Sequence, residues 1–275
     1  MKLIFLGSGS AFTVGADNFQ SNMILTDDLG HKLLIDCGSD IRLSLHAAGF
    51  SYQDITDIYI SHLHADHVGG LEYIGFSTKF DPRCQKPNIY TSADLADDLW
   101  ECTLAGGMRA IEGEIANLNT YFNVHKVKKS AVSGSLDRSG DFLWQGIKFY
   151  LVKVVHVNNG YFIMPSYGLF FEMNGTQVFI TTDTRISWEE MGEYYERADI
   201  IFHDCETSPF PTKVHAHYND LLKLPAKIRR KMWLYGYQPG KLPDAEKDGF
   251  CGFVHRGQTF KSSDLVAAPE VRIAV

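Results

Sequence analysis

The sequence predicts an α/β protein that folds as a four-layer αβ/βα sandwich. Short apolar strands are separated by Gly, Asp and Asn turns, and a few helical segments lie between them. Several strands end in His or Asp, as expected of two sheets whose edges converge on one cleft. With 275 residues, of which 45% are hydrophobic, the chain can bury a large core. We therefore expect a single domain over residues 1–275.

The N-terminal half contains strands and one helix that lead to a cluster of histidines. Residues 2–7 are predicted to form a strand, and residues 21–38 a hairpin whose turn is DDLG. Residues 40–50 have apolar positions at helical spacing, with Asp40 as a possible cap. Residues 55–67 begin as a buried strand and run directly into the histidines. The cluster therefore lies on a loop just past a strand end, where parallel sheets commonly present ligands.

The second half repeats this arrangement with a different sequence. Three strand-like runs cover residues 145–160, 167–184 and 198–206, and residues 221–240 are predicted as a helix followed by a strand. Each of the three runs delivers polar side chains near its end, namely His156, Asp183, and the group His203, Asp204 and Glu206. Strands that end in this way describe two sheets whose edges converge on one cleft.

Charge and cysteine content narrow the class of protein. Lys+Arg 26 against Asp+Glu 33 give a formal net charge of −7, so no global positive field attracts a polyanion. The first apolar run is too short for a signal peptide and no run reaches membrane length, which predicts a cytoplasmic protein without a membrane partner. The five cysteines are odd in number and widely spaced, which argues against a disulfide framework.

The stretch SHLHADHVGG, residues 61–70, carries the strongest chemical signal. On an extended or tightly turned backbone, His62 and His64 can face one point, while Asp66 and His67 turn toward a second point a few ångströms away. The spacing H-x-H-x-D-H is rare by composition, and a solvated polar loop is a poor explanation for it. The motif therefore predicts a binuclear metal site.

HLHADH resembles the signature of metallo-β-lactamase-fold hydrolases. The segments LGSGSAF, LLIDCG and TTDT follow in the order found in the ribonuclease Z-like branch of that fold. The resemblance implies that His156 joins His62 and His64 on one metal, and that Asp183 bridges both metals. It also implies two Zn²⁺ ions per chain, with Mn²⁺ as a possible substitute, and a homodimer.

One position departs from the family pattern. The branch places a further histidine, a ligand of the second metal, where MWLYGYQPG has Gly236. Only Asp66, His67 and Asp183 then remain for that metal, with His215, His217 and His255 as candidates nearby. We expect Gly236→His to restore a ligand, and Gly236→Ala to have little effect unless the backbone needs a positive φ. The remaining histidines are expected at the surface or in the core, namely His31, His46, His125 and His203.

The resemblance also implies a reaction. A metal-activated hydroxide, oriented by Asp66, would attack a phosphodiester, and His217 would protonate the leaving oxygen, poised by an acidic residue such as Glu206. The interval between the histidine cluster and His156 contains an acidic helical segment and only a small basic run, HKVKKSAVSGSLDRSGD, so RNA is a less favoured substrate.

The sequence therefore favours a small phosphodiester as the substrate. We expect a cyclic nucleotide, of the kind cleaved by relatives such as the phage anti-Pycsar phosphodiesterases. Two alternatives stay open: an RNA 3′-end endonuclease, and a degenerate member that binds a nucleotide without turnover because Gly236 replaces a ligand.

Overall fold

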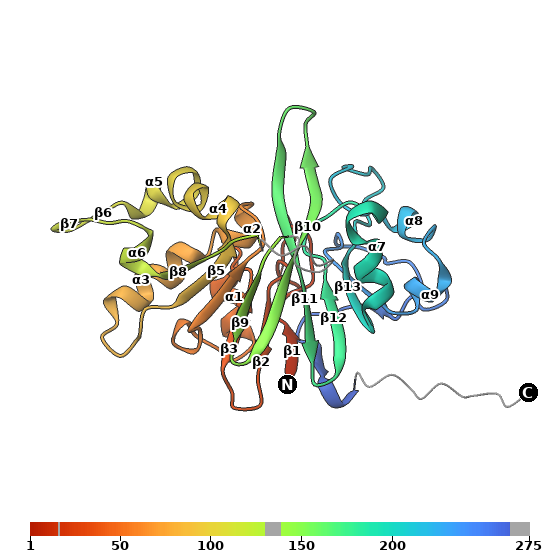
Figure 1. The fold of residues 1–275 in the computed structure, drawn as a ribbon, viewed down its shortest axis with the longest axis horizontal. Coiled ribbons are helices and arrows are strands. Elements are labelled where there is room, and N and C mark those ends of the chain that lie inside the picture. The colour runs from red at the N-terminus through yellow and green to blue at the C-terminus, as the bar shows by residue number, and fades with distance from the viewer. Residues whose placement is uncertain (16, 130–138, 265–275) are drawn as a thin grey trace, which may run out of the picture.

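The computed structural model describes residues 1–15, 17–129 and 139–264, and these form two seven-stranded sheets that pack face to face. Helices cover the outer face of each sheet (Figure 1). The layers are therefore helix, sheet, sheet and helix, which confirms the predicted four-layer αβ/βα sandwich. Within the described residues, no helix combines the length and the apolar character needed to cross a membrane.

The first sheet is built from the N-terminal half of the chain and one C-terminal strand. Its order is β16-β1-β2-β3-β4-β5-β8. Strands β2 and β3 form the predicted antiparallel hairpin, and β3, β4, β5 and β8 run parallel. The strands are β1 (Lys2–Phe5), β2 (Met23–Thr26), β3 (Lys32–Ile35), β4 (Asp57–Ile60), β5 (Asn88–Ser92), β8 (Asn123–Val127) and β16 (Thr259–Lys261).

Short helices of this half cover the outer face of the first sheet. The predicted helix over residues 40–50 is α1 (Ile41–Ala47), and Asp40 stands at its N-cap position. The Asp40 side chain makes no capping bond, and its Oδ2 accepts a hydrogen bond from the Gln20 N–H at 2.8 Å. The other elements are η1 (Tyr52–Asp54), α2 (Ala65–Val68), α3 (Leu71–Phe80), α4 (Ala93–Asp98), the π-helical η2 (Leu99–Leu104), α5 (Ala105–Met108), β6 (Ala110–Ile111), β7 (Glu114–Ile115) and α6 (Leu118–Tyr121).

The second sheet contains the strands of the C-terminal half. Its order is β15-β14-β13-β12-β11-β10-β9, and β12 to β15 run parallel. The strands are β9 (Asp141–Trp144), β10 (Ile147–Asn158), β11 (Ile163–Met173), β12 (Thr176–Ile180), β13 (Ile200–Asp204), β14 (Met232–Tyr235) and β15 (Gly252–Phe253). Its outer face is covered by α7 (Trp188–Arg197), α8 (Tyr218–Leu221) and α9 (Ala226–Arg229), and η3 (Ser262–Asp264) follows β16.

The two C-terminal strands on either side of His255 belong to different sheets. β15 pairs with β14 in the second sheet, whereas β16 pairs with β1 in the first. His255 lies in the connection between the two sheets and is exposed. The chain thus ties the two sheets together at this point, and His255 is not part of any cluster of potential ligands among the described residues.

The core between the sheets is apolar and aromatic. Phe5 of β1 packs against Phe202 of β13 and Tyr235 of β14, with ring centroids 5.2 and 5.6 Å apart. All three side chains are essentially inaccessible to solvent. Because interiors of this kind are packed as densely as organic crystals, they hold the two sheets in a fixed relation. The residues that follow the strands are therefore held in place as well.

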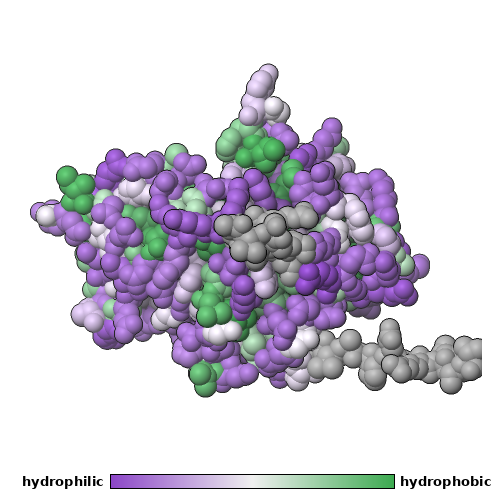
Figure 2. Space-filling view, viewed as in Figure 1, coloured by the Kyte–Doolittle hydropathy of each residue, from purple (hydrophilic) through white to green (hydrophobic). Residues whose placement is uncertain are grey.

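The β10–β11 hairpin projects beyond the body of the molecule (Figure 1). Its register shifts between Val155 and Asn158, which marks a bulge near the start of the projecting part. Around the turn, Tyr161, Phe162 and Ile163 are exposed. Figure 2 shows hydrophobic surface gathered on this projection. The hairpin thus carries apolar side chains away from the core.

Candidate metal centre

Ligand-type side chains from both sheets meet where the parallel strands end. From the first sheet, His62 follows β4, and His64 precedes the short helix α2 that carries Asp66 and His67. From the second sheet, His156 lies on β10, Asp183 follows β12, and Asp204 ends β13. The structure therefore brings together the six metal ligands predicted from the sequence, namely His62, His64, Asp66, His67, His156 and Asp183.

Three imidazoles converge on one point. The Nδ1 atom of His64 lies 3.1 Å from Nε2 of His62 and 3.0 Å from Nε2 of His156. One ring proton cannot satisfy three nitrogens that face each other. Tetrahedral zinc with bonds of about 2.0–2.1 Å would separate its nitrogen ligands by about 3.3 Å. The observed spacing fits such an ion, and Asp183 Oδ2 lies 3.9 and 3.8 Å from the Nε2 atoms of His62 and His156.

A second group forms around His67. Its Nε2 atom is 3.2 Å from Asp66 Oδ2 and 3.2 Å from Asp183 Oδ2. His67 is 2% exposed, and this nitrogen has no hydrogen-bond partner within the described residues. Because buried polar atoms are nearly always satisfied, an unpartnered ring nitrogen between two carboxylates fits a metal ligand. Asp183 Oδ2 belongs to both groups, as expected of a bridging carboxylate.

The electrostatics of the centre favour positive charge at His67 and neutral rings at His62 and His64. Burial would lower the pKa of His67, but the carboxylates of Asp183, Asp66 and Asp36 raise it well above its ordinary value. Burial lowers the pKa of His62 and His64, and neighbouring imidazoles add to the effect. A position where three carboxylates hold a proton also attracts a metal cation, and neutral imidazoles are the form that binds metal.

Hydrogen bonds to the outer nitrogens fix the orientation of these rings. His67 donates through Nδ1 to Asp36 Oδ2 at 2.7 Å, and His156 donates through Nδ1 to the Val214 carbonyl at 2.8 Å. Asp36 is itself held by Ser61, whose N–H and Oγ–H donate to its two oxygens at 2.8 and 2.7 Å. Asp36 was not singled out from the sequence, although an acidic residue directly after a buried strand was the available signal.

Asp36 supplies a test of this orienting role. Asp36→Asn should keep the backbone, since Asp36 has a φ of 61° and Asn tolerates that region. The amide is a weaker acceptor for the His67 N–H, so we expect metal affinity to fall by about 10–100-fold with little change in fold. Competition with a zinc chelator measures this, with thermal unfolding as the control. An unchanged affinity would show that Asp36 is only structural.

A third group lies beside the first two. The Nδ1 atom of His215 is 2.7 Å from Asp204 Oδ2 and 3.8 Å from Asp183 Oδ2. Burial would lower the pKa of His215, but Asp204 and Asp183 raise it to about 10. The sequence offered His215 as a candidate metal ligand. The structure places it at the edge of the centre, where it lines a pocket of about 300 Å³ together with Arg185, Lys213 and His217.

The side chains of Glu206 and His217 do not meet. Glu206 accepts hydrogen bonds from the N–H and Oγ–H of Thr212 at 3.0 Å. His217 caps α8 by accepting from the Asn219 N–H at 3.2 Å, and its Nε2 lies 3.0 Å from the Ser208 carbonyl. The sequence-based proton donor, His217 poised by Glu206, therefore differs from the His215–Asp204 pair that the structure places beside Asp183.

The histidines expected outside the centre all lie outside it. His31 pairs with Asp27 at the surface, His125 stacks on Tyr90, and His46 is exposed. His203 is buried, 2.6 Å from the Tyr195 hydroxyl, and burial lowers its pKa to about 4. His203 is therefore a neutral core residue.

Comparison with known proteins identifies the family of this chain. A family model described as Anti-Pycsar protein Apyc1 matches residues 1–260. This chain belongs to that family. The Apyc1 protein of Paenibacillus harenae is 33% identical over 238 residues, which cover 86% of this chain and 90% of the relative. That of Bacillus phage 010DV004 is 32% identical over 265 residues, 94% and 98% of the two chains.

The fold of this Apyc1-family chain has also been seen in solved structures. YhfI of Bacillus subtilis, described as a metallo-β-lactamase fold protein, superposes with a TM-score of 0.67 at 15% identity. The match covers 94% of this chain and 99% of YhfI. The predicted metallo-β-lactamase fold and the predicted resemblance to anti-Pycsar proteins are therefore confirmed.

Position 236 of this Apyc1-family chain follows β14 and adjoins the third group. Gly236 has a φ of +79°, and its N–H donates to the Ser8 carbonyl at 2.9 Å. A Cβ atom at this position would lie 2.7 Å from Asp204 Oδ1. The exception stated with the sequence-based expectation therefore applies: a side chain at position 236 meets both an unfavourable backbone conformation and a buried carboxylate.

We accordingly expect Gly236→Ala to lower the free energy of unfolding by about 1–3 kcal/mol. Gly257→Ala is the matched control, since Gly257 also has a φ of +79° but nothing lies within 4 Å of its added Cβ. Urea unfolding of both variants separates the backbone strain, which they share, from the contact with Asp204. Equal losses would mean that Asp204 moves aside freely. Gly236→His should be at least as destabilised as Gly236→Ala.

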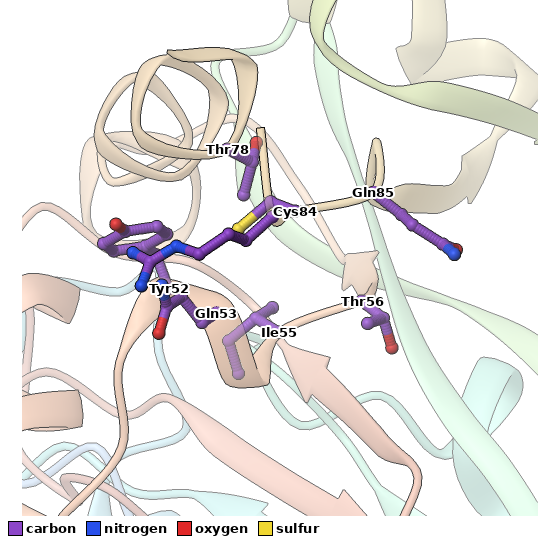
Figure 3. A pocket seen from close by; sticks show the side chains of 8 residues that line it. Tyr52, Gln53, Ile55, Thr56, Thr78, Cys84 and Gln85 are labelled. Carbon is purple, nitrogen blue, oxygen red and sulfur yellow. The ribbon is translucent and has the colours of Figure 1, made fainter. Parts of the chain in front are cut away.

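A separate pocket lies away from the metal centre, beside η1 and the end of α3 (Figure 3). Its volume is about 350 Å³, and Tyr52, Gln53 and Cys84 contribute to its wall. The Arg83 guanidinium in its lining is already engaged by Asp81, with bonds of 2.9 and 2.8 Å. None of the side chains that line it belongs to the metal centre, so we assign the chemistry to the centre.

Proposed function

We propose that this chain is a metal-dependent phosphodiesterase that hydrolyses a small cyclic nucleotide. One observation carries the proposal: two groups of ligands share Asp183 Oδ2, and the His215 pocket adjoins them. Two metals held by one carboxylate suit attack on phosphorus, since they serve the attacking oxygen and the leaving oxygen together.

The residues present define what each metal position would contain. His62, His64 and His156 would hold the first ion, and Asp66 and His67 the second, with Asp183 between them. Zinc, or manganese in its place, would supply an acidified water and neutralise charge on the phosphate. Imidazole nitrogens suit zinc, whereas carboxylate oxygens also accept manganese.

The chain's own side chains would orient the attacking water and donate a proton to the leaving oxygen. Asp66, at the start of α2, would position the attacking water. Burial would lower the pKa of His215, but Asp204 and Asp183 raise it to about 10, which favours the protonated imidazole that would donate to the leaving oxygen. Asp204 holds its Nδ1 in place. We assign to His215 and Asp204 the role that the sequence suggested for His217 and Glu206.

The pocket beside His215 supports a compact anionic substrate. Its volume of about 300 Å³ lies at the lower end of the range for small-molecule sites, about 300–1,000 Å³. Arg185 and Lys213 place two cations in its wall, suited to a phosphate. The exposed aromatic side chains of the β10–β11 hairpin, Tyr161 and Phe162, are candidates for contact with a nucleobase.

One of the other two hypotheses loses support from these features, and the other rests on the sequence argument alone. Both ligand groups form without a side chain at position 236, which argues against a member that has lost its metals through Gly236. The acidic helical segment that weighed against RNA forms α4 and η2. Residues 130–138 of the small basic run lie outside the described residues.

A substrate panel tests the proposal. Purified protein, with zinc or manganese added, is assayed against cyclic mononucleotides, a chromogenic phosphodiester and precursor tRNA. We expect the cyclic nucleotides to be preferred, with activity lost in chelator and restored by metal. Specific cleavage of precursor tRNA without turnover of cyclic nucleotides would favour the endonuclease. Nucleotide binding without hydrolysis at saturating metal would favour the non-catalytic member.

A further inference from the structure

A third set of potential ligands lies outside the six that the sequence assigned to the metals. Asp183, Asp204 and His215 each offer one ligand atom, and these atoms lie within 4.8 Å of one another. Asp183 belongs to all three sets. Asp204 and His215 therefore adjoin the bridging carboxylate without being part of either predicted metal position.

The Asp204 carboxylate is fixed on one side and unpartnered on the other. Its Oδ2 accepts hydrogen bonds from the Thr184 N–H at 3.0 Å and from His215 Nδ1 at 2.7 Å. Its Oδ1 has no hydrogen-bond partner in the part of the chain that the structure describes, and the side chain is 1% exposed. A buried carboxylate oxygen without a donor is costly. A metal cation would satisfy it.

The unpartnered oxygen occupies the space that a side chain at position 236 would enter. Oδ1 lies 2.7 Å from the Cβ that Gly236 lacks. Gly236 has a left-handed backbone conformation and no side chain. The carboxylate of Asp204, at the end of β13, lies where a side chain at position 236, just after β14, would begin.

Charge balance points the same way. Four carboxylates lie at or beside the centre, those of Asp36, Asp66, Asp183 and Asp204, and the imidazoles of the first position are uncharged when they bind metal. Two divalent cations would face these four carboxylates, and His215 already pairs with Asp204 through Oδ2. A metal bound through Oδ1 would place a cation against the oxygen of Asp204 that has no partner among the described residues.

We propose that Asp204 is a protein ligand of the second metal and replaces the histidine missing at position 236. This inference rests on the metal-dependent function proposed above. Asp204 is grouped with Asp183 and His215 and lies outside the group of Asp66, His67 and Asp183, so its carboxylate would turn toward the second metal as that ion binds. The position would then have three carboxylates, Asp66, Asp183 and Asp204, and a single imidazole, His67. The first position has three imidazoles and one carboxylate. Because oxygen ligands suit manganese better than they suit zinc, the second position should accept Mn²⁺ more readily than the first.

The test measures metal binding directly. Wild-type protein, Asp204→Asn and the control Asp57→Asn are dialysed, and their metal content is determined by elemental analysis. Asp57 is also a buried aspartate, 6% exposed, but it lies at the start of β4 and bonds Thr56 and Asn88. Protein that holds zinc in the first position only is then titrated with Mn²⁺. Electron paramagnetic resonance monitors the bound Mn²⁺ and gives the affinity of the second position.

We expect wild type and Asp57→Asn to hold two metals, and Asp204→Asn to keep the first and bind the second at least about tenfold more weakly. His215→Gln should retain both, because it removes only the partner of Oδ2. Asp204→Ser provides a second variant if the asparagine protein does not fold.

Two results would overturn the assignment while leaving the phosphodiesterase proposal intact. One is two metals with wild-type affinity in Asp204→Asn. The other is loss of the second metal in His215→Gln but not in Asp204→Asn, which would make His215 the ligand. A wild-type protein that binds no metal would instead overturn the proposed function, and this inference with it.

Discussion

Asp183→Asn is expected to remove metal from both positions and to lower turnover of a cyclic nucleotide by about 10³-fold or more. Asp183 Oδ2 lies between 3.2 and 3.9 Å from ring nitrogens of His67, His62 and His156, so a single carboxylate serves both groups. The asparagine side chain has the same shape but cannot bridge two cations as an anion.

Elemental analysis and steady-state kinetics check this prediction together. Asp183 is 5% exposed, and Asp57→Asn again controls for replacing a buried aspartate. If Asp183→Asn retains two metals and loses only activity, the residue orients substrate instead of bridging. If it retains both metals and full turnover, the centre built around it is not the active site.

The sequence predicted the metal ligands most reliably where they lie close together in the chain. His62, His64, Asp66 and His67 lie within six consecutive positions, and the end of β4 followed by the turn into α2 is enough to place them. His156 and Asp183 are about 90 and 120 residues further along the chain, so only the pattern of strands that end in His or Asp and the family resemblance linked them to the motif. Their approach depends on how the two sheets pack.

Two features lay beyond the sequence for identifiable physical reasons. A glycine permits either sign of φ, so the sequence could not predict that φ of Gly236 is +79° or that a Cβ atom there would contact Asp204. His215 and His217 are two residues apart, and residues with that spacing share a face only while the chain stays extended. The chain turns into α8 at His217, whose ring caps the helix, and this leaves His215 to face the centre.

Replacement of His215 is the second substitution for which we expect a large loss of activity. Loss of a general acid typically costs about 10²–10⁴-fold in rate, so we expect His215→Ala to lower turnover of a cyclic nucleotide by a factor in that range. The cost should be far smaller for a chromogenic nitrophenyl phosphodiester, because nitrophenolate leaves readily without a proton, whereas a sugar alkoxide does not. Metal content should be unchanged.

The comparison of two substrates distinguishes proton donation from a structural role. A variant that only disturbs the fold or the metals loses activity on both substrates alike, whereas the loss of an acid is selective for the poor leaving group. His217→Ala is the matched control, since His217 lines the same pocket two residues away. If His217→Ala shows the selective loss and His215→Ala does not, the acid is His217, as the sequence suggested. In that case the Asp204–His215 pair serves only to order the centre.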